Sequence, residues 1–568
     1  MVEATNVLDP GQSGVTRLVG GRTHVLTALE QHVRERPEAT AYEYYTSFDM
    51  ESRYSVLSFH QLDEVARVIG SRLAERTRPG DRVALMFPTG PEFVQALLGT
   101  FYAGAIAVPV PYPSAFNAHG DRLEGILQDC TPELVVTTDD MAGDPAVEEA
   151  RSSDVRQTAR LSLSSLTQGP PGEQRTQYDL ECGAFIQYTS GSTGRPKGVV
   201  VSHGNLSANL ELIQLALQGS PTTPVVGWIP HTHDMGLVGH LLWSLYAAAP
   251  CSVVPPLEFA KRPTAWIDMI SDGGYYGTAA PNSAYEVVAR IYPDAKLSDL
   301  DLSRWSVALN GAEPISAKST RRFTTRFATA GFQESSFVPA YGLAEATLFV
   351  TCSRPQEPVS IRRFDTEQLW KGRAIETSEP HGIELVASGP ANASGITVRD
   401  HTGVVVGDHQ LGTIHVRGDH VTRRYWNQPP IGADLDTGDF GFIYEGDLYV
   451  TGRAKDLIIV NGRNIAATDV EESVSEICTL ARPDGVVAFQ SSQPDDARVH
   501  IFIEVPRSLT DEISGKSTID EVIQDQLSSQ FGITALQVTK LRAGQIPRTT
   551  SGKVRRAETY NRFGTPKV

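Results

Sequence analysis

The sequence predicts an α/β protein: a large N-terminal domain of parallel sheets covered by helices, followed by a small α+β domain. In the first half, helical stretches alternate with short β-rich runs, and this order builds a parallel sheet with helices on both faces. Beyond about residue 386 the periodicity becomes short and strand-like, which predicts a small β-rich subdomain. After residue 452 a strand, an amphipathic helix and another strand follow, as expected for a separate α+β domain.

The expected elements follow in the order that this fold needs. Residues 62–76 have apolar side chains at helical spacing, and a Pro-Gly turn leads into a strand at 82–87. Residues 93–112 are uncharged over about the length of a membrane span, but their prolines favour a buried helix at 91–102 and a strand at 105–110. Further strands are expected at 133–138, 184–188, 412–416, 447–450, 455–460 and 499–505, with a helix at 469–479.

Length, charge and cysteine content narrow the kind of protein. The 568 residues allow about three to five compact units. With 50 Lys and Arg against 67 Asp and Glu, the formal charge is −17, which disfavours binding to nucleic acid or anionic lipid but allows a local basic pocket. The five cysteines have no paired spacing, and the start lacks the charge order of a signal peptide. We therefore expect a cytoplasmic protein without disulfides or a membrane span.

The most informative segment directly follows the expected strand at 184–188. It is rich in small and hydroxylated residues and holds a lysine; its members are Thr189, Ser190, Gly191, Ser192, Thr193, Gly194, Arg195, Pro196, Lys197 and Gly198. Such a backbone can direct N–H groups at an anion, while the hydroxyls add donors and the lysine adds charge. The order differs from a Walker loop, because a glycine follows the lysine. A plain surface turn is the alternative, and the position after a strand favours phosphate binding.

This loop closely resembles the core motif of the adenylate-forming superfamily of acyl-CoA synthetases, luciferases and peptide-synthetase adenylation domains. Further segments match that superfamily in order and spacing, at residues 227–236, 308–314, 341–347, 437–439, 452–456 and 547–553. The resemblance covers nearly the whole chain. It implies an N-terminal AMP- and acyl-binding domain at 1–451, a hinge at 452–456 that includes Lys455 and Asp456, and a mobile C-terminal domain at 457–568.

Within the superfamily, the motifs at 233–237, 308–314 and 341–348 resemble those of the fatty acyl-AMP ligases. That branch carries an extra segment that rejects coenzyme A, and residues 355–375 resemble it, although spacing alone would make them an ordinary surface loop. The resemblance implies activation of a fatty acid by ATP to an acyl-adenylate, with release of pyrophosphate. The acyl group then passes to the phosphopantetheine thiol of an acyl carrier protein or downstream synthase, in polyketide, lipopeptide or lipid biosynthesis.

The resemblance also assigns roles to single residues. Lys553, Glu345 and His233 are the expected catalytic residues, and Glu345 is the candidate ligand of Mg²⁺. ATP is expected to contact the loop residues Thr189 to Gly194 with Lys197. Around the adenine and ribose the expected contacts are Asn310, Gly311, Ala312, Glu313, Tyr341, Gly342, Thr347, Asp439 and Arg453. The acyl pocket is expected around residues 235–242 and 278–285, including His233, Met235, Gly236 and Thr278.

Several alternatives stay open. His231, His233 and Asp234 resemble a metal-ligand cluster, although no second histidine cluster follows at a useful spacing. A fatty acyl-CoA synthetase would share the first half-reaction and use free coenzyme A, and a non-catalytic nucleotide or acyl sensor is the alternative from another class. An acidic carrier protein would need a local basic patch, for which Arg482 or the Arg555-Arg556 pair are candidates. The sequence does not identify the acyl chain, the carrier protein or the oligomeric state.

We expect Lys553→Ala to abolish adenylate formation, because a mobile ammonium reaches the attacking carboxylate and the α-phosphate together and stabilises the charge that builds between them. Transfer from preformed acyl-AMP should stay largely intact. Separate assays of the two half-reactions check this, and an equal loss of both would contradict the role of Lys553.

Overall fold

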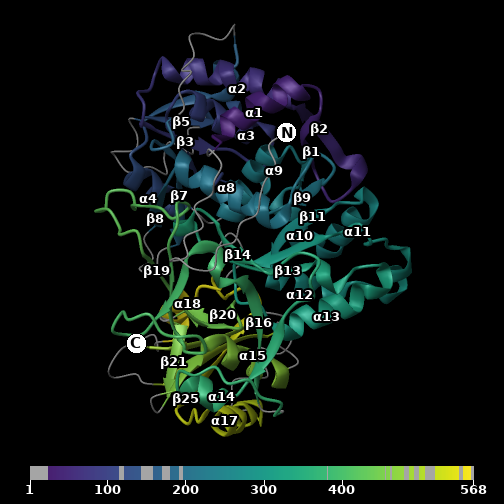
Figure 1. Cartoon of the computed structure of the whole chain (residues 1–568), viewed down its shortest axis with the longest axis vertical. Coiled ribbons are helices and arrows are strands. Elements are labelled where there is room, and N and C mark those ends of the chain that lie inside the picture. Colours follow the sequence, from purple (N-terminus) through teal and green to yellow (C-terminus); the bar gives the residue numbers. More distant parts are fainter. Residues whose placement is uncertain are drawn as a thin grey trace, which may run out of the picture.

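The computed structural model describes residues 23–113, 120–142, 158–168, 179–190, 196–379, 382–453, 456–460, 463–478, 485–491, 498–505, 518–548 and 554–564. Figure 1 shows the elements of the N-terminal half stacked at one end of the long axis and the C-terminal elements at the other. The antiparallel sheet of the middle region lies between them.

The first sheet of the N-terminal half is mostly parallel. Its order is β6-β5-β3-β4-β7-β8, and only the β7–β8 pair is antiparallel. The strands are β3 (Arg82–Met86), β4 (Ile106–Pro109), β5 (Leu134–Thr137), β6 (Ala159–Ser162), β7 (Gly183–Ser190) and β8 (Pro196–Ser202). The strands expected at 82–87, 105–110, 133–138 and 184–188 are thus confirmed.

The second sheet has eight strands among the described residues, in the order β14-β13-β12-β11-β9-β10-β1-β2. All pairs from β13 to β1 are parallel, and the two outer pairs are antiparallel. The strands are β1 (Thr40–Tyr45), β2 (Arg53–Ser58), β9 (Val225–Gly227), β10 (Cys251–Val253), β11 (Gly277–Pro281), β12 (Val307–Gly311), β13 (Phe337–Gly342) and β14 (Phe349–Cys352). Because neighbouring strands run parallel, their carboxyl ends share one edge, where ligands bind in such sheets.

Helices pack around and between these two sheets, and the largest core cluster contains residues of both. They are α1 (Val25–Glu35), α2 (Phe59–Ala74), α3 (Pro91–Tyr102), α4 (Gly120–Cys130), α5 (Asp139–Ala142), α7 (Leu163–Leu166), α8 (His203–Leu217), the π-helix η3 (Met235–Leu242), α9 (Trp243–Ala247), α10 (Pro256–Lys261), α11 (Pro263–Gly273), α12 (Asn282–Ile291) and α13 (Ala317–Phe327). The helix expected at 91–102 is α3, whose bounds match. Within the described residues no helix is long and apolar enough to cross a bilayer.

A third, antiparallel sheet has the order β15-β16-β20-β19-β18-β17. Its strands are β15 (Ile361–Phe364), β16 (Ile383–Pro390), β17 (Ile396–Arg399), β18 (Gly412–Val416), β19 (Leu435–Tyr444) and β20 (Asp447–Arg453). The β-rich region therefore begins at Ile361 rather than near residue 386, because the segment at 355–375 supplies β15 and the short helix α14 (Thr366–Trp370). The surface-loop alternative for that segment is wrong: β15 pairs with β16 over four residues.

The elements after β20 have a core of their own. They are β21 (Leu457–Val460), β22 (Arg463–Ala466), α15 (Ala467–Ile477), β23 (Val486–Gln490), β24 (Val499–Val505), α17 (Thr518–Phe531), β25 (Leu536–Arg542) and α18 (Arg556–Phe563). The strands expected at 455–460 and 499–505 and the helix at 469–479 are found within two residues of their predicted bounds.

Local signals explain where helices α2 and α8 begin. Ser58 and Ser202 each accept a hydrogen bond from the backbone N–H three residues later, and Gln61 and Asn205 complete capping boxes. Asn205 also donates to the backbone oxygens of Asp419 and Val421 at 2.7 and 3.0 Å. These bonds fix the start of α8 to residues 419–421, which follow β18 of the third sheet.

Asn209 of α8 holds the loop between β13 and β14. Its side chain is fully buried and donates to the oxygens of Ala346 and Phe349, at 3.2 and 2.7 Å, and accepts from Phe349 N–H at 3.1 Å. We expect Asn209→Ala to destabilise the full chain by about 2–4 kcal/mol, because it leaves these backbone groups buried without partners. Urea unfolding measures the loss. The exposed Gln31→Ala serves as the control, and equal costs for both variants would contradict this role of Asn209.

Candidate active site

One large cavity, of about 2360 Å³, opens at the carboxyl ends of the parallel strands and extends toward the C-terminal elements. Most of the expected site residues line it: Thr189, Lys197, His233, Met235, Thr278, Gly311, Ala312, Glu313, Tyr341, Gly342, Glu345, Asp439, Arg453 and Asp456. Motifs that are far apart in the sequence therefore meet in one place.

The other expected site residues fall into two groups. Gly191, Ser192, Thr193, Gly194, Lys455 and Lys553, with the side chain of Ser190, lie outside the described residues. Asn310, Thr347 and Gly236 are described but do not line the cavity. Asn310 is buried and donates to Asn282 at 3.2 Å, and Thr347 is buried and donates to the oxygen of His420 at 2.7 Å. A Cβ on Gly236 would lie 2.3 Å from the oxygen of Pro230, so this glycine allows a close backbone approach.

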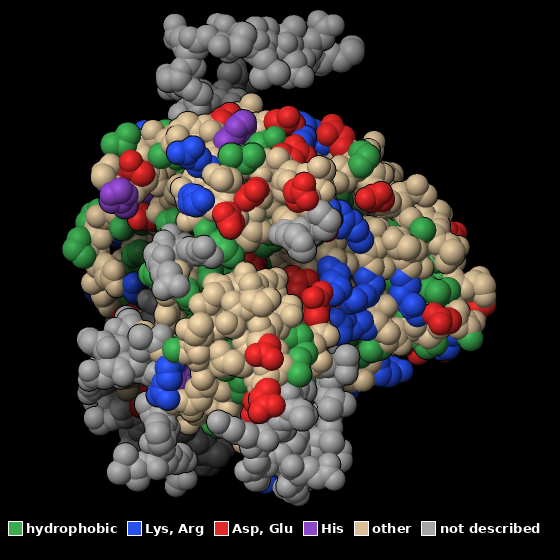
Figure 2. Space-filling model, turned by 90° about the horizontal axis from the view of Figure 1, so that it is seen from below, with side chains coloured by type: hydrophobic (Ala, Val, Ile, Leu, Met, Phe, Trp, Pro, Cys, Tyr) green, Lys and Arg blue, Asp and Glu red, His purple; other side chains and the backbone are tan. Residues whose placement is uncertain are grey.

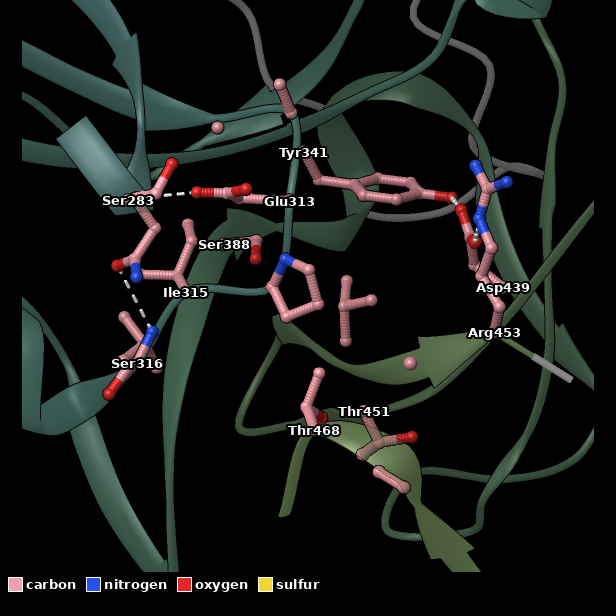
Figure 3. A pocket seen from close by; sticks show the side chains of 18 of the residues that line it. Ser283, Glu313, Ile315, Ser316, Tyr341, Ser388, Asp439, Thr451, Arg453 and Thr468 are labelled. Atoms are coloured by element: carbon pink, nitrogen blue, oxygen red, sulfur yellow. Dashed lines mark hydrogen bonds and ion pairs between the residues drawn. The ribbon is translucent and has the colours of Figure 1, made fainter. Parts of the chain in front are cut away.

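A buried carboxylate marks one end of the cavity. Tyr341 of β13 donates to Asp439 of β19 at 2.7 Å, and Arg453 at the end of β20 contacts the other carboxylate oxygen at 3.1 Å (Figure 3). Burial, with the nearby Asp439 charge, raises the pKa of Tyr341 well above its usual value, so its hydroxyl stays a donor. Acidic residues of this kind accept hydrogen bonds from ribose hydroxyls in other nucleotide sites.

The turn after β12 forms the wall next to this carboxylate. Ala312 has a left-handed backbone, with φ of 71°, which is uncommon for a residue other than glycine. Glu313 accepts a hydrogen bond from the backbone N–H of Ser283 at the start of α12 (Figure 3). The ends of β11 and β12 are thereby joined, and the backbone of the turn lies along the cavity where an adenine ring is expected.

Another part of the cavity wall holds a lysine, a tyrosine and a glutamate. Thr189 and Lys197 are register partners in the β7–β8 hairpin, and the Lys197 ammonium lies 5.5 Å from the centre of the Tyr425 ring. Tyr425 donates to Glu345 at 2.9 Å. Arg122 of α4 also lines the cavity, and it donates to the oxygen of Tyr188 at 3.4 Å. The expected phosphate-binding lysine and the expected metal ligand are therefore linked through Tyr425.

Sequence reasoning missed Tyr425 and Arg122. Tyr425 reaches the cavity because it forms an isolated bridge with Val199 of β8, a pairing across more than two hundred residues. Arg122 precedes the loop motif by about seventy residues and has no motif around it. An aromatic pair at Tyr425-Trp426 next to two arginines was the only local signal, and it does not indicate a phosphate site by itself.

The histidine segment ahead of η3 gives no metal cluster. His233 Nδ1 lies 2.7 Å from Asp234 Oδ1, and both side chains contact the backbone N–H of Met235. His231 is stacked on Phe93 with ring centres 3.8 Å apart, and burial lowers its pKa to about 4. Within the described part of the chain, no group of three or more His, Cys, Asp or Glu could hold a metal. His233 lines the cavity wall, while His231 packs on Phe93 and does not line the cavity.

An apolar tunnel extends from the cavity along one face of the second sheet. Met235, Gly239 and His240 of η3 line it as expected, together with Leu309 and Leu348. Its inner end lies at the amino ends of the strands, where Val225, Gly277 and Val307 are register partners. Val307 precedes Gly311 by four residues, so the tunnel is about 13 Å deep along β12. Ile213, Leu217, Trp243 and Tyr276 line the same region, and the sequence did not identify this wall.

The C-terminal elements contact the cavity from the other side. Arg556 of α18 contacts Glu471 at 2.7 Å and the expected hinge residue Asp456 at 3.4 Å. Lys318 of α13 and Glu476 of α15 form an ion pair of 2.5 Å between the two halves of the chain. Trp370, in the segment at 355–375, lies against Phe531 of α17 with ring centres 6.5 Å apart. That segment therefore contacts the C-terminal core.

Comparisons with known proteins agree with this geometry. The AMP-binding enzyme family matches residues 29–426. The long-chain-fatty-acid–AMP ligase FadD26 of Mycobacterium tuberculosis is 34% identical, over 95% of this chain and 97% of FadD26. The medium-chain-fatty-acid–[acyl-carrier-protein] ligase JamA of Moorena producens is 31% identical, over 90% of each chain.

A solved structure points the same way. A chain from structural and functional studies of fatty acyl-adenylate ligases from E. coli and L. pneumophila superimposes with a TM-score of 0.86, at 32% identity, over 95% of this chain and 97% of that one. The fold class expected from the sequence is thereby confirmed. The chain belongs to the AMP-binding enzymes of the adenylate-forming superfamily and, within them, to the fatty acyl-AMP ligases.

Proposed function

We propose that this protein uses ATP to activate a fatty acid as its acyl-adenylate, releases pyrophosphate, and passes the acyl group to the phosphopantetheine thiol of an acyl carrier protein. The observation that carries the proposal is the meeting of three chemically distinct regions in one cavity. A buried carboxylate suits ribose hydroxyls, a cationic end suits phosphates, and an apolar tunnel suits an acyl chain.

The charges of the cavity suit a reaction between two anions. A fatty acid carboxylate has to approach the α-phosphate while pyrophosphate departs, so repulsion must be neutralised and both reactants oriented. Lys197 and Arg122 supply positive charge at the phosphate end, and Arg453 supplies it beside Asp439. We assign Lys553 to the α-phosphate and His233 to the carboxylate at the tunnel mouth.

The donor set around Glu345 fits Mg²⁺ held mainly by the nucleotide. Mg²⁺ in phosphoryl sites is bound by one or two carboxylates together with phosphate oxygens and water. Glu345 is such a carboxylate on the cavity wall, and the Tyr425 hydroxyl orients it. When bound, the ion would neutralise charge on the leaving pyrophosphate. Lys197 holds the same phosphates from the β7–β8 hairpin.

The acceptor is inferred from the names of two relatives. JamA is named as a ligase for an acyl carrier protein, and FadD26 as a fatty acid–AMP ligase. We propose a phosphopantetheinylated carrier protein, free or within a synthase of polyketide, lipopeptide or lipid assembly. We propose that residues 355–375 prevent coenzyme A from serving as the acyl acceptor.

The products formed with two acceptors test the function. The protein is given ATP, Mg²⁺ and a series of fatty acids, with either coenzyme A or a phosphopantetheinylated carrier protein, and mass spectrometry identifies the products. We expect acyl-adenylate with some of the acids, and acyl-carrier protein in preference to acyl-CoA. Efficient acyl-CoA formation would contradict the assigned acceptor. Absence of any adenylate would favour a nucleotide or acyl sensor.

Tyr425→Phe tests the cationic end of the cavity. The ring next to Lys197 is kept, but the hydrogen bond to Glu345 is lost, and a bond to a charged group contributes about 1.5–3 kcal/mol. We expect kcat/KM for ATP to fall about 10- to 100-fold. Tyr444→Phe is the matched control, because Tyr444 donates to the carboxylate of Glu376 at 3.0 Å and does not line the cavity. A similar loss in both variants would contradict a role for Tyr425.

Trp243 and Ile213 test the inner wall of the tunnel. Trp243→Ala should shift the preferred fatty acid toward longer chains, and Ile213→Phe should shift it toward shorter ones, because the first lengthens and the second shortens the tunnel. Pyrophosphate release over a series of saturated acids measures the shift. Thermal unfolding accompanies it, since a buried Trp→Ala exchange costs about 3–5 kcal/mol. An unchanged chain-length profile in both folded variants would show that the tunnel ends elsewhere.

A further inference from the structure

A shallow depression of about 770 Å³ lies on α12 and α13, outside the site described above, although Arg290 lines both. It is lined by Arg290, Arg321, Arg322 and Arg326, with Ala289 and Thr325. Among the described residues, its lining thus has four arginines and no acidic side chain. A concave surface with this lining is complementary to a carboxylate- or phosphate-bearing partner.

The sequence of α13 explains how the arginines gather. Phe323 and Phe327 face the core, while arginines at 321, 322 and 326 recur on the outward side, as an amphipathic helix requires. Arg290 joins them from the last turn of α12, which packs beside α13. In Figure 2, Lys and Arg side chains gather on the side of the molecule where Figure 1 places α13.

Nearby carboxylates only partly neutralise this surface. Arg290 and Arg322 both contact Glu286, which is buried beneath them, and Arg321 and Arg363 share Glu384. Arg326 contacts Asp294 at 2.6 Å. In these described ion pairs five arginines meet three carboxylates, so positive charge is in excess at this place on a chain of net charge −17.

The arginine surface continues into the active-site cavity. Asn282, Ser283, Glu286 and Arg290 of α12 all line that cavity, and Arg290 lines the depression as well. Residues spaced by four lie on one face of a helix, so one side of α12 leads from the Glu313–Ser283 contact to the arginines. A partner seated here could extend a flexible arm along α12 to the reacting atoms.

The basic residues expected near the C-terminus are less suitable. Arg556 is paired with Glu471 and Asp456, and Arg555 contacts Glu558. Arg482 lies outside the described residues. Neither described residue forms a concave arginine surface of this kind.

We propose that the arginine surface of α12 and α13 docks an acidic face of the carrier protein that accepts the acyl group. This inference rests on the proposed function and adds the place of docking. A compact acidic protein is favoured over a nucleic acid or an anionic membrane, because the surrounding −17 charge repels an extended polyanion. Charge complementarity of this kind mainly increases the association rate and selects the partner.

The double variant Arg321→Glu/Arg322→Gln tests the docking surface. Neither residue lines the active-site cavity, the amide introduced by Arg322→Gln can still donate to Glu286, and the partner carboxylates keep Arg290 and Arg363. Arg76→Glu/Arg417→Gln is the matched control, because it makes the same charge change at exposed arginines elsewhere. Arg321→Glu alone provides a milder variant if the double variant fails to fold.

Three readouts are compared: adenylate formation without acceptor, transfer to free pantetheine, and transfer to the phosphopantetheinylated carrier protein. We expect only the KM for the carrier protein to rise, by about tenfold, with the rise shrinking at high salt. An unchanged KM, or an equal rise in the control, would overturn the docking surface. If wild-type protein forms adenylate and acylates the carrier, such a result overturns this inference alone. Lack of adenylate in the wild type would instead overturn the proposed function.

Discussion

The hydrogen bond between Tyr341 and Asp439 connects the second sheet to the third, and the rest of the site depends on this connection. Tyr341 lies near the end of β13 in the mostly parallel eight-stranded sheet, whereas Asp439 lies in the antiparallel third sheet, and their 2.7 Å contact is buried. Arg453 completes the contact at the last residue of β20, within the expected hinge at 452–456. A buried carboxylate needs such partners, because desolvation without them is costly. This contact therefore fixes the expected ribose site relative to the strands that carry the expected adenine wall and hinge.

A second constraint is the handling of charge. The chain is strongly acidic, yet the proposed reaction brings together ATP and a carboxylate. In the structure, Lys197, Arg122 and Arg453 are distributed around one cavity, and the carboxylates Asp439 and Glu345 accept hydrogen bonds from tyrosine hydroxyls. The arginine surface on α12 and α13 is a further local excess of positive charge, located where α12 leaves the cavity. The net charge of −17 therefore describes the protein as a whole, and single sites on it can carry an excess of positive charge.

Much of the fold could be predicted from the sequence, because periodicity reports on single elements. The bounds of α3, β18 and β24 match their predicted ranges, and the other elements for which a range was predicted differ by one to three residues. The start of the third sheet was misplaced, because β15 and α14 carry mixed charge and resemble a loop. The strand character of β15 depends on its pairing with β16, which local periodicity does not report.

Site residues within motifs were found because motif order places them at the ends of strands. Residues that reach the cavity through tertiary pairing were missed: Tyr425 through its bridge to Val199, and Trp243 and Tyr276 through helix and sheet packing. Conversely, Asn310 and Thr347 belong to motifs, but their side chains do not line the cavity and instead donate hydrogen bonds within the protein, to Asn282 and to the oxygen of His420. A motif thus identifies the backbone segment at the site, and packing decides which of its side chains reach the ligand.

Fatty-acid-dependent exchange of labelled pyrophosphate into ATP is the sharpest test of the proposed adenylation, because it reports reversible adenylate formation without any acceptor. We expect exchange that requires a fatty acid and Mg²⁺, and that proceeds without coenzyme A or carrier protein. Exchange that is absent with every fatty acid, or that is equally fast without one, would contradict it.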